Sequence, residues 1–166
     1  MQYIAGGVCA PKGFKAAGVH CGIRRNRSKY DLALIVSDEL ASAAAVYTQN
    51  LVKGAPILVT QKHLENGYAR AVIVNSGNAN TCNANGIEIA EGMCALVREY
   101  TGIREEDVAV ASTGVIGQPL SLQPISDGMQ SLVDALSPDG SVDAANAIMT
   151  TDTLLKQFAV EFEVDG

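Results

Sequence analysis

Tryptophan is absent from the sequence, aromatic residues make up 5% of it, and charged residues make up 18%, below the roughly 25% usual in soluble domains. Acidic residues outnumber basic ones by 18 to 12, so the net charge is −6. This balance argues against a general nucleic-acid binder, because such proteins use a basic surface to displace counterions. We interpret the single basic cluster, Arg24, Arg25, Arg27 and Lys29, as a solvated turn, with phosphate binding as the alternative.

Cysteine and histidine are also scarce, which bears on metal sites and disulfides. The four cysteines are Cys9, Cys21, Cys82 and Cys94, no C-x-x-C pair occurs, and there are two histidines. This spacing does not suit a zinc site, so we expect no metal. A disulfide scaffold is equally unexpected in a chain with ample apolar residues and no secretory signal. We therefore expect buried free thiols, a reducing compartment and a cytoplasmic location.

Familiar motifs of membrane insertion and catalysis are missing too. The longest uncharged run, residues 108–126, contains glycines, prolines and glutamines, so it does not predict a membrane span. There is no G-x-G-x-x-G or G-x-x-x-x-G-K-[ST] loop for nucleotides and no G-x-S-x-G. No nucleophile beside a base is evident, because we expect His20 to be structural and His63 to be exposed at a helix start.

Small and apolar residues are what the sequence has in abundance. Apolar residues make up 48% of it, enough for a buried core, and its 23 alanines and 16 glycines allow backbones to approach closely. No linker or repeat divides the chain, so we expect residues 1–166 to form a single domain. A surface this poor in charge suggests that a partner covers part of it.

Hydrophobic patterning predicts strands and helices in irregular alternation. The expected strands cover residues 14–23, 31–37, 42–48, 56–60, 71–75, 107–112 and 158–164, and the expected helices cover 86–100, 121–136 and 144–149. Two strand–loop–helix units accompany strands that follow one another directly. This mixture favours a mixed α+β (α/β) fold, with layered sheets and flanking helices, over a regular Rossmann repeat.

Two of the expected strands end in loops of small polar residues. Residues 75–85 contain five asparagines. One interpretation is a tight surface turn, and the other is a segment whose side-chain amides bind a polar ligand or a neighbouring loop. Residues 112–117 begin with Ser-Thr-Gly. There the Thr113 hydroxyl beside the Gly114 N–H is the pair of donors that a developing oxyanion needs, and an ordinary strand-to-helix turn is the alternative.

A third polar segment, Met-Thr-Thr-Asp-Thr at residues 149–153, lies near the chain's end. Three hydroxyls around one carboxylate suit either the binding of a polar substrate or a turn between helix and strand. The residues alone therefore offer binding and stabilising groups without an attacking nucleophile. An alternative interpretation of the protein is therefore a non-catalytic α/β module that binds a small ligand.

Taken in order, these motifs resemble those of one enzyme family. They are Gly-Gly-Val-Cys-Ala-Pro-Lys-Gly-Phe at 6–14, Val-Tyr-Thr-Gln-Asn at 46–50, Asn-Ser-Gly-Asn-Ala-Asn at 75–80, Ser-Thr-Gly-Val-Ile-Gly at 112–117 and Met-Thr-Thr-Asp-Thr at 149–153. From residue 6 to residue 164 the chain resembles the α-chain part of the ornithine acetyltransferase family, whose members are often bifunctional glutamate N-acetyltransferases of arginine biosynthesis. The resemblance implies a layered fold shared with self-cleaving aminopeptidases and completed by a second chain.

The resemblance also implies a mechanism. The precursor cleaves itself before a threonine, which heads the β chain and acts as nucleophile with its own α-amine as base. The acetyl group passes from N-acetylornithine to the enzyme and then to glutamate by ping-pong kinetics. Some members accept acetyl-CoA, and no other cofactor is implied. The expected assembly is a heterotetramer of two α and two β chains, without nucleic-acid or membrane partners.

Three residues carry over from the family pattern. Thr113 and Gly114 match its oxyanion hole, and Thr150 matches a substrate-binding threonine, with Thr151 as its substitute if the match is displaced by one residue. The family's cleavage segment, a glycine-rich stretch ending in alanine before threonine, does not occur up to Asp165-Gly166. We therefore expect the nucleophile and a substrate-binding lysine to lie outside this sequence, and the chain to be inactive by itself.

Overall fold

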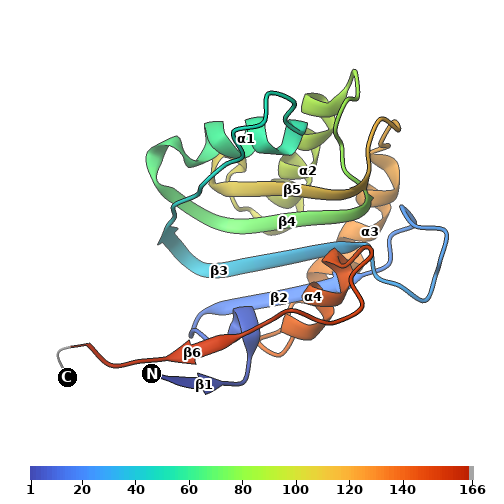
Figure 1. Cartoon of the computed structure of the whole chain (residues 1–166). Helices are drawn as coiled ribbons and strands as arrows, with labels where there is room; N and C mark the ends of the chain where they lie inside the picture. Colours follow the sequence, from blue (N-terminus) through green and yellow to red (C-terminus); the bar gives the residue numbers. More distant parts are fainter. Residues whose placement is uncertain (165–166) are drawn as a thin grey trace.

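A four-stranded sheet with the strand order β2-β3-β4-β5 organises the computed structural model, which describes residues 1–164 (Figure 1). Its strands are β2 (Phe14–Val19), β3 (Leu32–Ser42), β4 (Tyr68–Asn78) and β5 (Val108–Val115). The helices are α1 (Ala55–His63), α2 (Gly86–Thr101), α3 (Gln123–Asp134) and α4 (Ser141–Ile148), with short 3-10 turns at Gly7–Cys9, Leu64–Asn66 and Glu105–Asp107. Asp165 and Gly166, which bear on the expected position of the cleavage segment, lie outside the described residues.

The sheet is mixed in its strand directions. β2, β3 and β4 pair antiparallel, whereas β5 pairs parallel with β4. Parallel neighbours need a crossover connection, and the segment that contains α2 supplies it. Since parallel strands run the same way, their C-terminal ends meet at one edge of the sheet. The crossover therefore brings the polar ends of β4 and β5 together.

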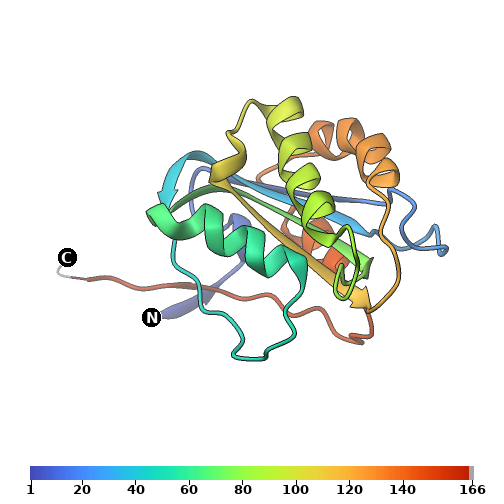
Figure 2. The same cartoon turned by 90° about the horizontal axis from the view of Figure 1, so that it is seen from above.

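Helices cover both faces of the sheet, but unequally. α2 and α3 pack on one face and α4 on the other (Figure 2). The larger core lies under α2 and α3 and includes Met93, Val97, Ile125, Met129 and Leu132. The smaller core, under α4, consists of Ala16, Ala33, Ala144 and Ala147. Small residues let α4 lie very close to β2, where a Cβ added to Gly18 would come within 2.1 Å of the Asp143 carbonyl oxygen.

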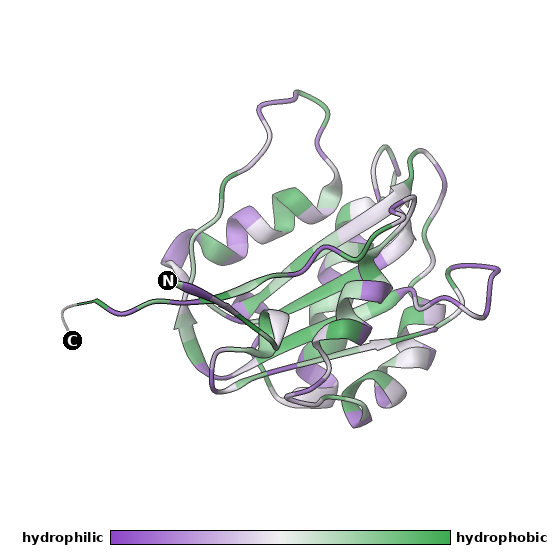
Figure 3. Cartoon of the chain, turned by 60° about the horizontal axis from the view of Figure 1, so that its bottom comes forward, coloured by the Kyte–Doolittle hydropathy of each residue, from purple (hydrophilic) through white to green (hydrophobic). Residues whose placement is uncertain are grey.

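A separate two-stranded ribbon joins the two ends of the described chain. β1 (Gln2–Ile4) pairs antiparallel with β6 (Ala159–Glu161). Its neighbourhood exposes large apolar side chains, with Tyr3 78%, Phe158 82% and Phe162 65% accessible. Figure 3 shows this C-terminal segment alternating between hydrophobic and hydrophilic residues, while the strands of the main sheet are mostly hydrophobic. Isolated ribbons of two strands are only marginally stable, and exposed apolar groups of this kind are typical of interaction surfaces.

The layered α/β architecture agrees with the sequence prediction, but two predicted strands are wrong. Residues 56–60 belong to α1, where Pro56 occupies the first turn, in which a missing N–H leaves no helical hydrogen bond unmade. β3 ends at Ser42, and residues 43–48 form no strand because no neighbouring strand pairs with them; Val46 is 99% exposed there. The strand expected at residues 158–164 is shortened to β6. No helix among residues 1–164 combines the length and the hydropathy that a membrane crossing requires.

Candidate functional site

Two of the predicted polar segments meet at the ends of β4 and β5. In the parallel ladder Ser76 pairs with Thr113 and Gly77 pairs with Gly114. The sequence predicted loops at both places, but the two strands continue through them, to Asn78 in β4 and to Val115 in β5. Both glycines have positive φ, +100° at Gly77 and +133° at Gly114, so the strands extend here with a backbone geometry that other residues rarely adopt.

Gly114 has no room for a side chain. A Cβ at this position would lie 2.4 Å from the carbonyl carbon of Gly77 and 2.6 Å from the backbone nitrogen of Asn78. Because both are main-chain atoms of the neighbouring strand, they could not move aside without disturbing the ladder. The two strand ends are therefore in close backbone contact, with Gly114 itself exposed.

β5 is an outer strand of the four-stranded sheet, and α1 covers the first half of its free edge. The Thr60 hydroxyl lies 2.9 Å from the Val110 nitrogen and 2.8 Å from the Val110 carbonyl oxygen, accepting from the first and donating to the second. Nδ1 of His63 donates to the Val108 carbonyl at 2.8 Å. We call residues 108–111 the capped half of β5, because α1 side chains satisfy its outward-facing backbone groups.

Residues 112–115 form the open half of β5. Alternate residues of a strand direct their N–H and C=O groups to the same side, so Ser112 and Gly114 face outward like Val110. Within residues 1–164 no group hydrogen-bonds to the Gly114 N–H or the Ser112 carbonyl. The open half thus presents a free N–H on an exposed glycine, which is one of the two donors that the sequence predicted.

The Thr113 side chain, which carries the second donor that the sequence predicted, lies on the face of the sheet that carries α4. It stands on the same face as the side chain of its ladder partner Ser76, and the Ser76 hydroxyl donates to the Ala147 carbonyl of α4. Thr113 is half-buried. The Thr113 hydroxyl and the Gly114 N–H thus belong to adjacent residues at the end of β5, and an oxyanion hole consists of two such donors.

The asparagine-rich segment holds loops together. The buried Asn75 amide donates to the Asn78 carbonyl at 2.9 Å, and the Asn78 amide donates to the Gln118 carbonyl at 3.0 Å. The Asn80 amide donates to the Gly86 carbonyl at 2.8 Å, at the start of α2. Of the alternatives that the sequence left open, the structure favours amides that fix neighbouring loops, and one of those loops follows directly on β5.

The third polar segment reaches the same end of the sheet. Thr150 follows α4, is half-buried and lies beyond the Ala147 carbonyl that Ser76 binds. The guanidinium of Arg24 donates to the Met149 carbonyl, one residue before Thr150. These two hydrogen bonds tie the end of α4 to β4 and to the loop between β2 and β3, so all three predicted segments are brought together.

Arg24 is the residue of this site that sequence reasoning missed. Its backbone N–H donates to the buried Asp31 carboxylate at 2.8 Å. Its side chain lies along Gly77, where a Cβ would come within 2.9 Å of Arg24 Cγ. The only signal in the sequence was its place in the basic cluster, which does not distinguish it from the neighbouring cations.

The two histidines serve the fold. Nδ1 of His20 lies 3.0 Å from the Lys29 carbonyl and 3.2 Å from Oδ2 of Asp31, so the structural role expected for it is confirmed. The prediction for His63 was wrong in two ways. It lies at the end of α1 rather than at a helix start, and it is half-buried against Val108.

The cysteines are free, as predicted, but they are not uniformly buried. Burial raises the pKa of Cys21 and of Cys94 to about 12, with nearby carboxylates adding to the effect. Cys82 is exposed, which corrects the expectation of buried thiols. Among residues 1–164, no three His, Cys, Asp or Glu side chains gather in an arrangement that could hold a metal ion.

Comparisons with known proteins agree on one family. The model of the ArgJ family matches residues 15–166. Over its full length the chain is 48% identical to the arginine biosynthesis bifunctional protein ArgJ of Caldanaerobacter subterraneus and 42% identical to the glutamate N-acetyltransferase of Methanocaldococcus jannaschii. It spans only 41% and 40% of the lengths of these two relatives.

Solved structures give the same result. A crystal structure of the arginine biosynthesis bifunctional protein ArgJ of Bacillus halodurans is 41% identical, with a TM-score of 0.85 over 92% of this chain and 81% of that one. The ornithine acetyltransferase of Mycobacterium tuberculosis complexed with ornithine is 39% identical, with a TM-score of 0.83 over 92% of this chain and 84% of that one. By sequence and by fold, the chain belongs to the ArgJ family.

Proposed function

We propose that the chain is the α-chain part of an acetyltransferase that moves an acetyl group from N-acetylornithine to glutamate. The support is its membership of the ArgJ family, together with the names of two relatives, arginine biosynthesis bifunctional protein ArgJ and glutamate N-acetyltransferase. One relative of known structure binds ornithine, which is the product of the first half-reaction. We assign the enzyme to the cytoplasm and give it no resident cofactor or metal. Acetyl-CoA, which the family resemblance implies for some members, is the alternative acetyl donor to assay.

A second chain completes this enzyme in our proposal. The chain spans 41% of the Caldanaerobacter relative but 81% of the crystallised Bacillus halodurans polypeptide. The crystallised Bacillus halodurans polypeptide is thus about half as long as the Caldanaerobacter relative, a difference that supports a precursor cleaved into two chains. Residues 1–166 then form one domain of the α chain, and a β chain that begins with the nucleophilic threonine pairs with it in a heterotetramer.

The observation that carries the catalytic role is the free Gly114 N–H on the open half of β5, beside Thr113. When the threonine hydroxyl of the β chain attacks the acetyl carbon, its proton passes to the N-terminal amine, and the carbonyl oxygen becomes an oxyanion. The Thr113 hydroxyl and the Gly114 N–H hold that oxyanion, a contribution of about 3 kcal/mol per donor in comparable enzymes. The intermediate collapses when the C–N bond breaks and the leaving amine of ornithine takes up the proton.

The second half-reaction reverses these steps with glutamate as acceptor. The amine of glutamate attacks the acetyl-enzyme, the same two donors hold the oxyanion, and N-acetylglutamate leaves as the threonine hydroxyl recovers its proton. Thr150, half-buried beside this site, binds the substrate. Thr151 is exposed and lies one residue farther from Met149, whose carbonyl accepts the hydrogen bond of Arg24. We therefore assign substrate binding to Thr150.

Co-expression with a β chain that begins with threonine tests the proposal. Acetyl transfer from N-acetylornithine to glutamate is expected once the two chains associate, and the first half-reaction alone should leave an acetyl group on the β chain, visible by mass spectrometry. Failure to transfer by a folded and associated pair would refute the proposal. The native mass is a second test, since a monomer that binds ligand alone would instead favour a non-catalytic binding module.

A further inference from the structure

The loop between β2 and β3 carries four cations that lack carboxylate partners. Arg24, Arg25, Arg27 and Lys29 are four of the twelve basic residues in a protein of net charge −6. Within residues 1–164 every ion pair with a carboxylate within 4.0 Å involves other cations. The one buried carboxylate beneath the loop, Asp31, is held by the backbone N–H groups of Cys21 and Arg24. The loop therefore keeps an excess of positive charge.

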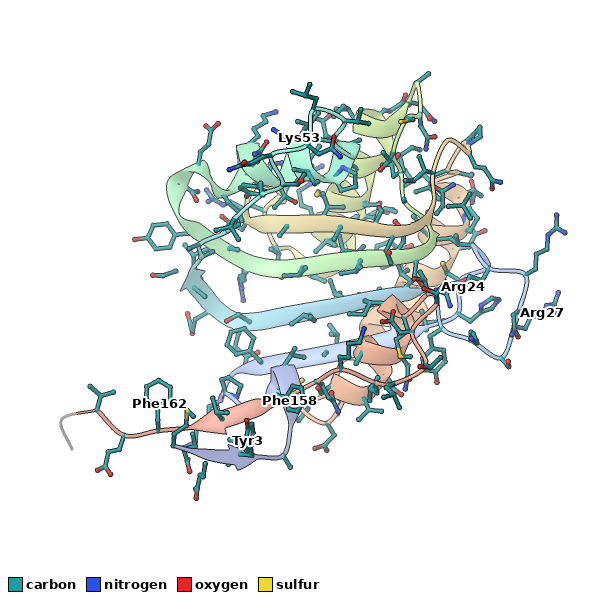
Figure 4. All side chains as sticks on the ribbon, in the orientation of Figure 1. Tyr3, Arg24, Arg27, Lys53, Phe158 and Phe162 are labelled. Carbon is teal, nitrogen blue, oxygen red and sulfur yellow. The ribbon has the colours of Figure 1, made fainter. Side chains whose placement is uncertain are left out.

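Two of these cations line a cavity beside the end of α4, and the other two do not reach it. Arg24 and Lys29 line a cavity of about 310 Å³ whose other walls are Ser28, Tyr30, Asn146, Met149 and Asp152. Arg25 and Arg27 line a different cavity, which Arg24 also borders and whose other walls are His20, Cys21 and Gly22. Figure 4 shows Arg24 at the end of the sheet and Arg27 on the outer part of the loop, away from it. Hydroxyl, amide, guanidinium and ammonium donors in one cavity are the groups that bind anions.

Arg24 is fixed in place and joins this cavity to the candidate catalytic site. Its backbone is held by Asp31, its guanidinium by the Met149 carbonyl, and its stem lies along Gly77. Gly77 is the ladder partner of Gly114, and neighbouring strands lie about 5 Å apart. One guanidinium has five N–H donors, so others remain for a ligand. Because the Arg24 stem lies beside Gly77, one strand away from Gly114, an amino acid whose nitrogen reacts near Gly114 can direct a carboxylate toward Arg24.

We propose that this cavity binds a carboxylate of glutamate, the acceptor, through Arg24 and Lys29. The inference rests on the proposed function and deepens it by adding a subsite. A singly charged carboxylate fits better than a phosphate, because Asp152 also lines the cavity and repels a ligand more strongly as its negative charge grows. The hydrogen bond from Lys156 lowers the pKa of Asp152, which keeps that carboxylate ionised at neutral pH.

Single charge removals in the two-chain enzyme test this subsite. Arg24→Gln and Lys29→Gln should each raise the KM for glutamate at least about tenfold, with kcat changed less than about twofold, because a charge-assisted hydrogen bond contributes about 1.5–3 kcal/mol. Arg25→Gln and Arg27→Gln remove the same charge from the same loop outside the cavity, and they should leave KM unchanged. Within residues 1–164 the Lys29 side chain forms no hydrogen bond or ion pair with another residue, so its variant stays informative if Arg24→Gln fails to fold.

Two outcomes would overturn the subsite. One is equal KM values in Lys29→Gln and its loop controls. The other is a rise in the KM for acetyl-CoA without one for glutamate, which would mark a phosphate site. Calorimetric titration of the two-chain enzyme with glutamate separates this inference from the proposed function. If glutamate binding depends on Lys29 but no acetyl transfer occurs, the subsite is supported and the proposed function is refuted. If acetyl transfer occurs but glutamate binding does not depend on Lys29, the function is supported and the subsite is refuted.

Discussion

The two halves of the β5 edge differ in how their backbone groups are satisfied. In the capped half, Thr60 and His63 bind the outward-facing groups of Val110 and Val108. In the open half, the corresponding groups of Ser112 and Gly114 have no partner within residues 1–164. One strand therefore contains a segment whose outward-facing groups are bound by α1 and a segment whose outward-facing groups are free within residues 1–164.

The difference shows how a free donor can be kept on a sheet edge. Unpaired edges invite association with other chains, and proteins usually cover them. Here α1 covers the edge as far as Val110 and leaves uncovered the next two outward-facing residues, Ser112 and Gly114. The open half also has the backbone contact between Gly77 and Gly114 that keeps its strand in place. The edge is left open where the proposed chemistry needs it.

Gly114→Ala should have the largest effect on the open half. The new Cβ would collide with the backbone of Gly77 and Asn78, at 2.4 Å and 2.6 Å, and φ is +133°. We expect the free energy of unfolding to fall by about 3 kcal/mol or more, measured by urea denaturation, with acetyl transfer lost.

Gly117→Ala is the matched control for that substitution. Gly117 also has positive φ, +76°, but nothing lies within 4 Å of an added Cβ. The free energy of unfolding of Gly117→Ala should therefore fall by about 1 kcal/mol, from backbone strain alone. Equal stability of the two variants would mean that the close contact between β4 and β5 at Gly114 is absent in solution.

Thr113→Ala should slow catalysis without weakening the fold. If the hydroxyl holds the oxyanion, its loss lowers kcat about 100-fold or more and leaves KM and the urea midpoint nearly unchanged. The first half-reaction, followed as acetylation of the β chain, should slow by the same factor. Thr113→Ser keeps the hydroxyl and should retain most of the activity. An unchanged kcat in Thr113→Ala would remove the residue from the oxyanion hole.

Thr60→Val acts on the capped half and should have the opposite signature. The substitution conserves shape but removes both hydrogen bonds to Val110, whose backbone is buried. We expect a loss of about 1–3 kcal/mol in the free energy of unfolding, with kcat per folded molecule unchanged. Thr153→Val, at an exposed position, is the control and should change neither. A fall in kcat with intact stability would contradict the separation of the two halves.

The sequence could predict those parts of the fold that depend on local pattern. The helical face of Ala90, Cys94 and Val97 and the glycine stop at Gly102 locate α2, although Ile87, predicted on the same face, is exposed. The apolar run ending at Asn75 locates the middle of β4. Pro56 misled the prediction because Pro-Ile-Leu-Val-Thr is apolar and β-branched, and only the tertiary structure shows that it opens a helix. Short apolar runs are ambiguous between the two elements.

The candidate site was predictable as segments, whereas its geometry was not. Ser-Thr-Gly at the end of a strand indicated Thr113 and Gly114 without any knowledge of the ladder. The Thr60–Val110 and Arg24–Met149 hydrogen bonds join residues 50 and 125 positions apart. No local pattern specifies such pairs, so the capped half of β5 and the role of Arg24 could emerge only from the structure.

Thiol labelling compares the two halves without altering either. Sγ of Cys94 lies 3.9 Å from the Val108 carbonyl, behind the capped half. Cys82 is exposed and follows Thr81, whose carbonyl accepts from the Gly117 N–H just beyond the open half. Iodoacetamide at pH 8, read by peptide mass mapping, should label Cys82 readily and leave Cys94 unmodified.

The pKa of Cys94 gives this experiment its control. At about 12, it leaves only about one thiol in ten thousand ionised at pH 8, and two further pH units raise that fraction about 100-fold. The labelling rate of Cys94 should therefore be low at pH 8 and increase with pH, whereas rapid labelling at pH 8 would mean that the capped half opens.

The same labelling in the two-chain enzyme tests where the β chain lies. A lower labelling rate of Cys82 with an unchanged rate of Cys94 would place the β chain over the open half. Equal rates with and without the β chain would place that chain elsewhere, and the Gly114 N–H would then stay open to water during the reaction.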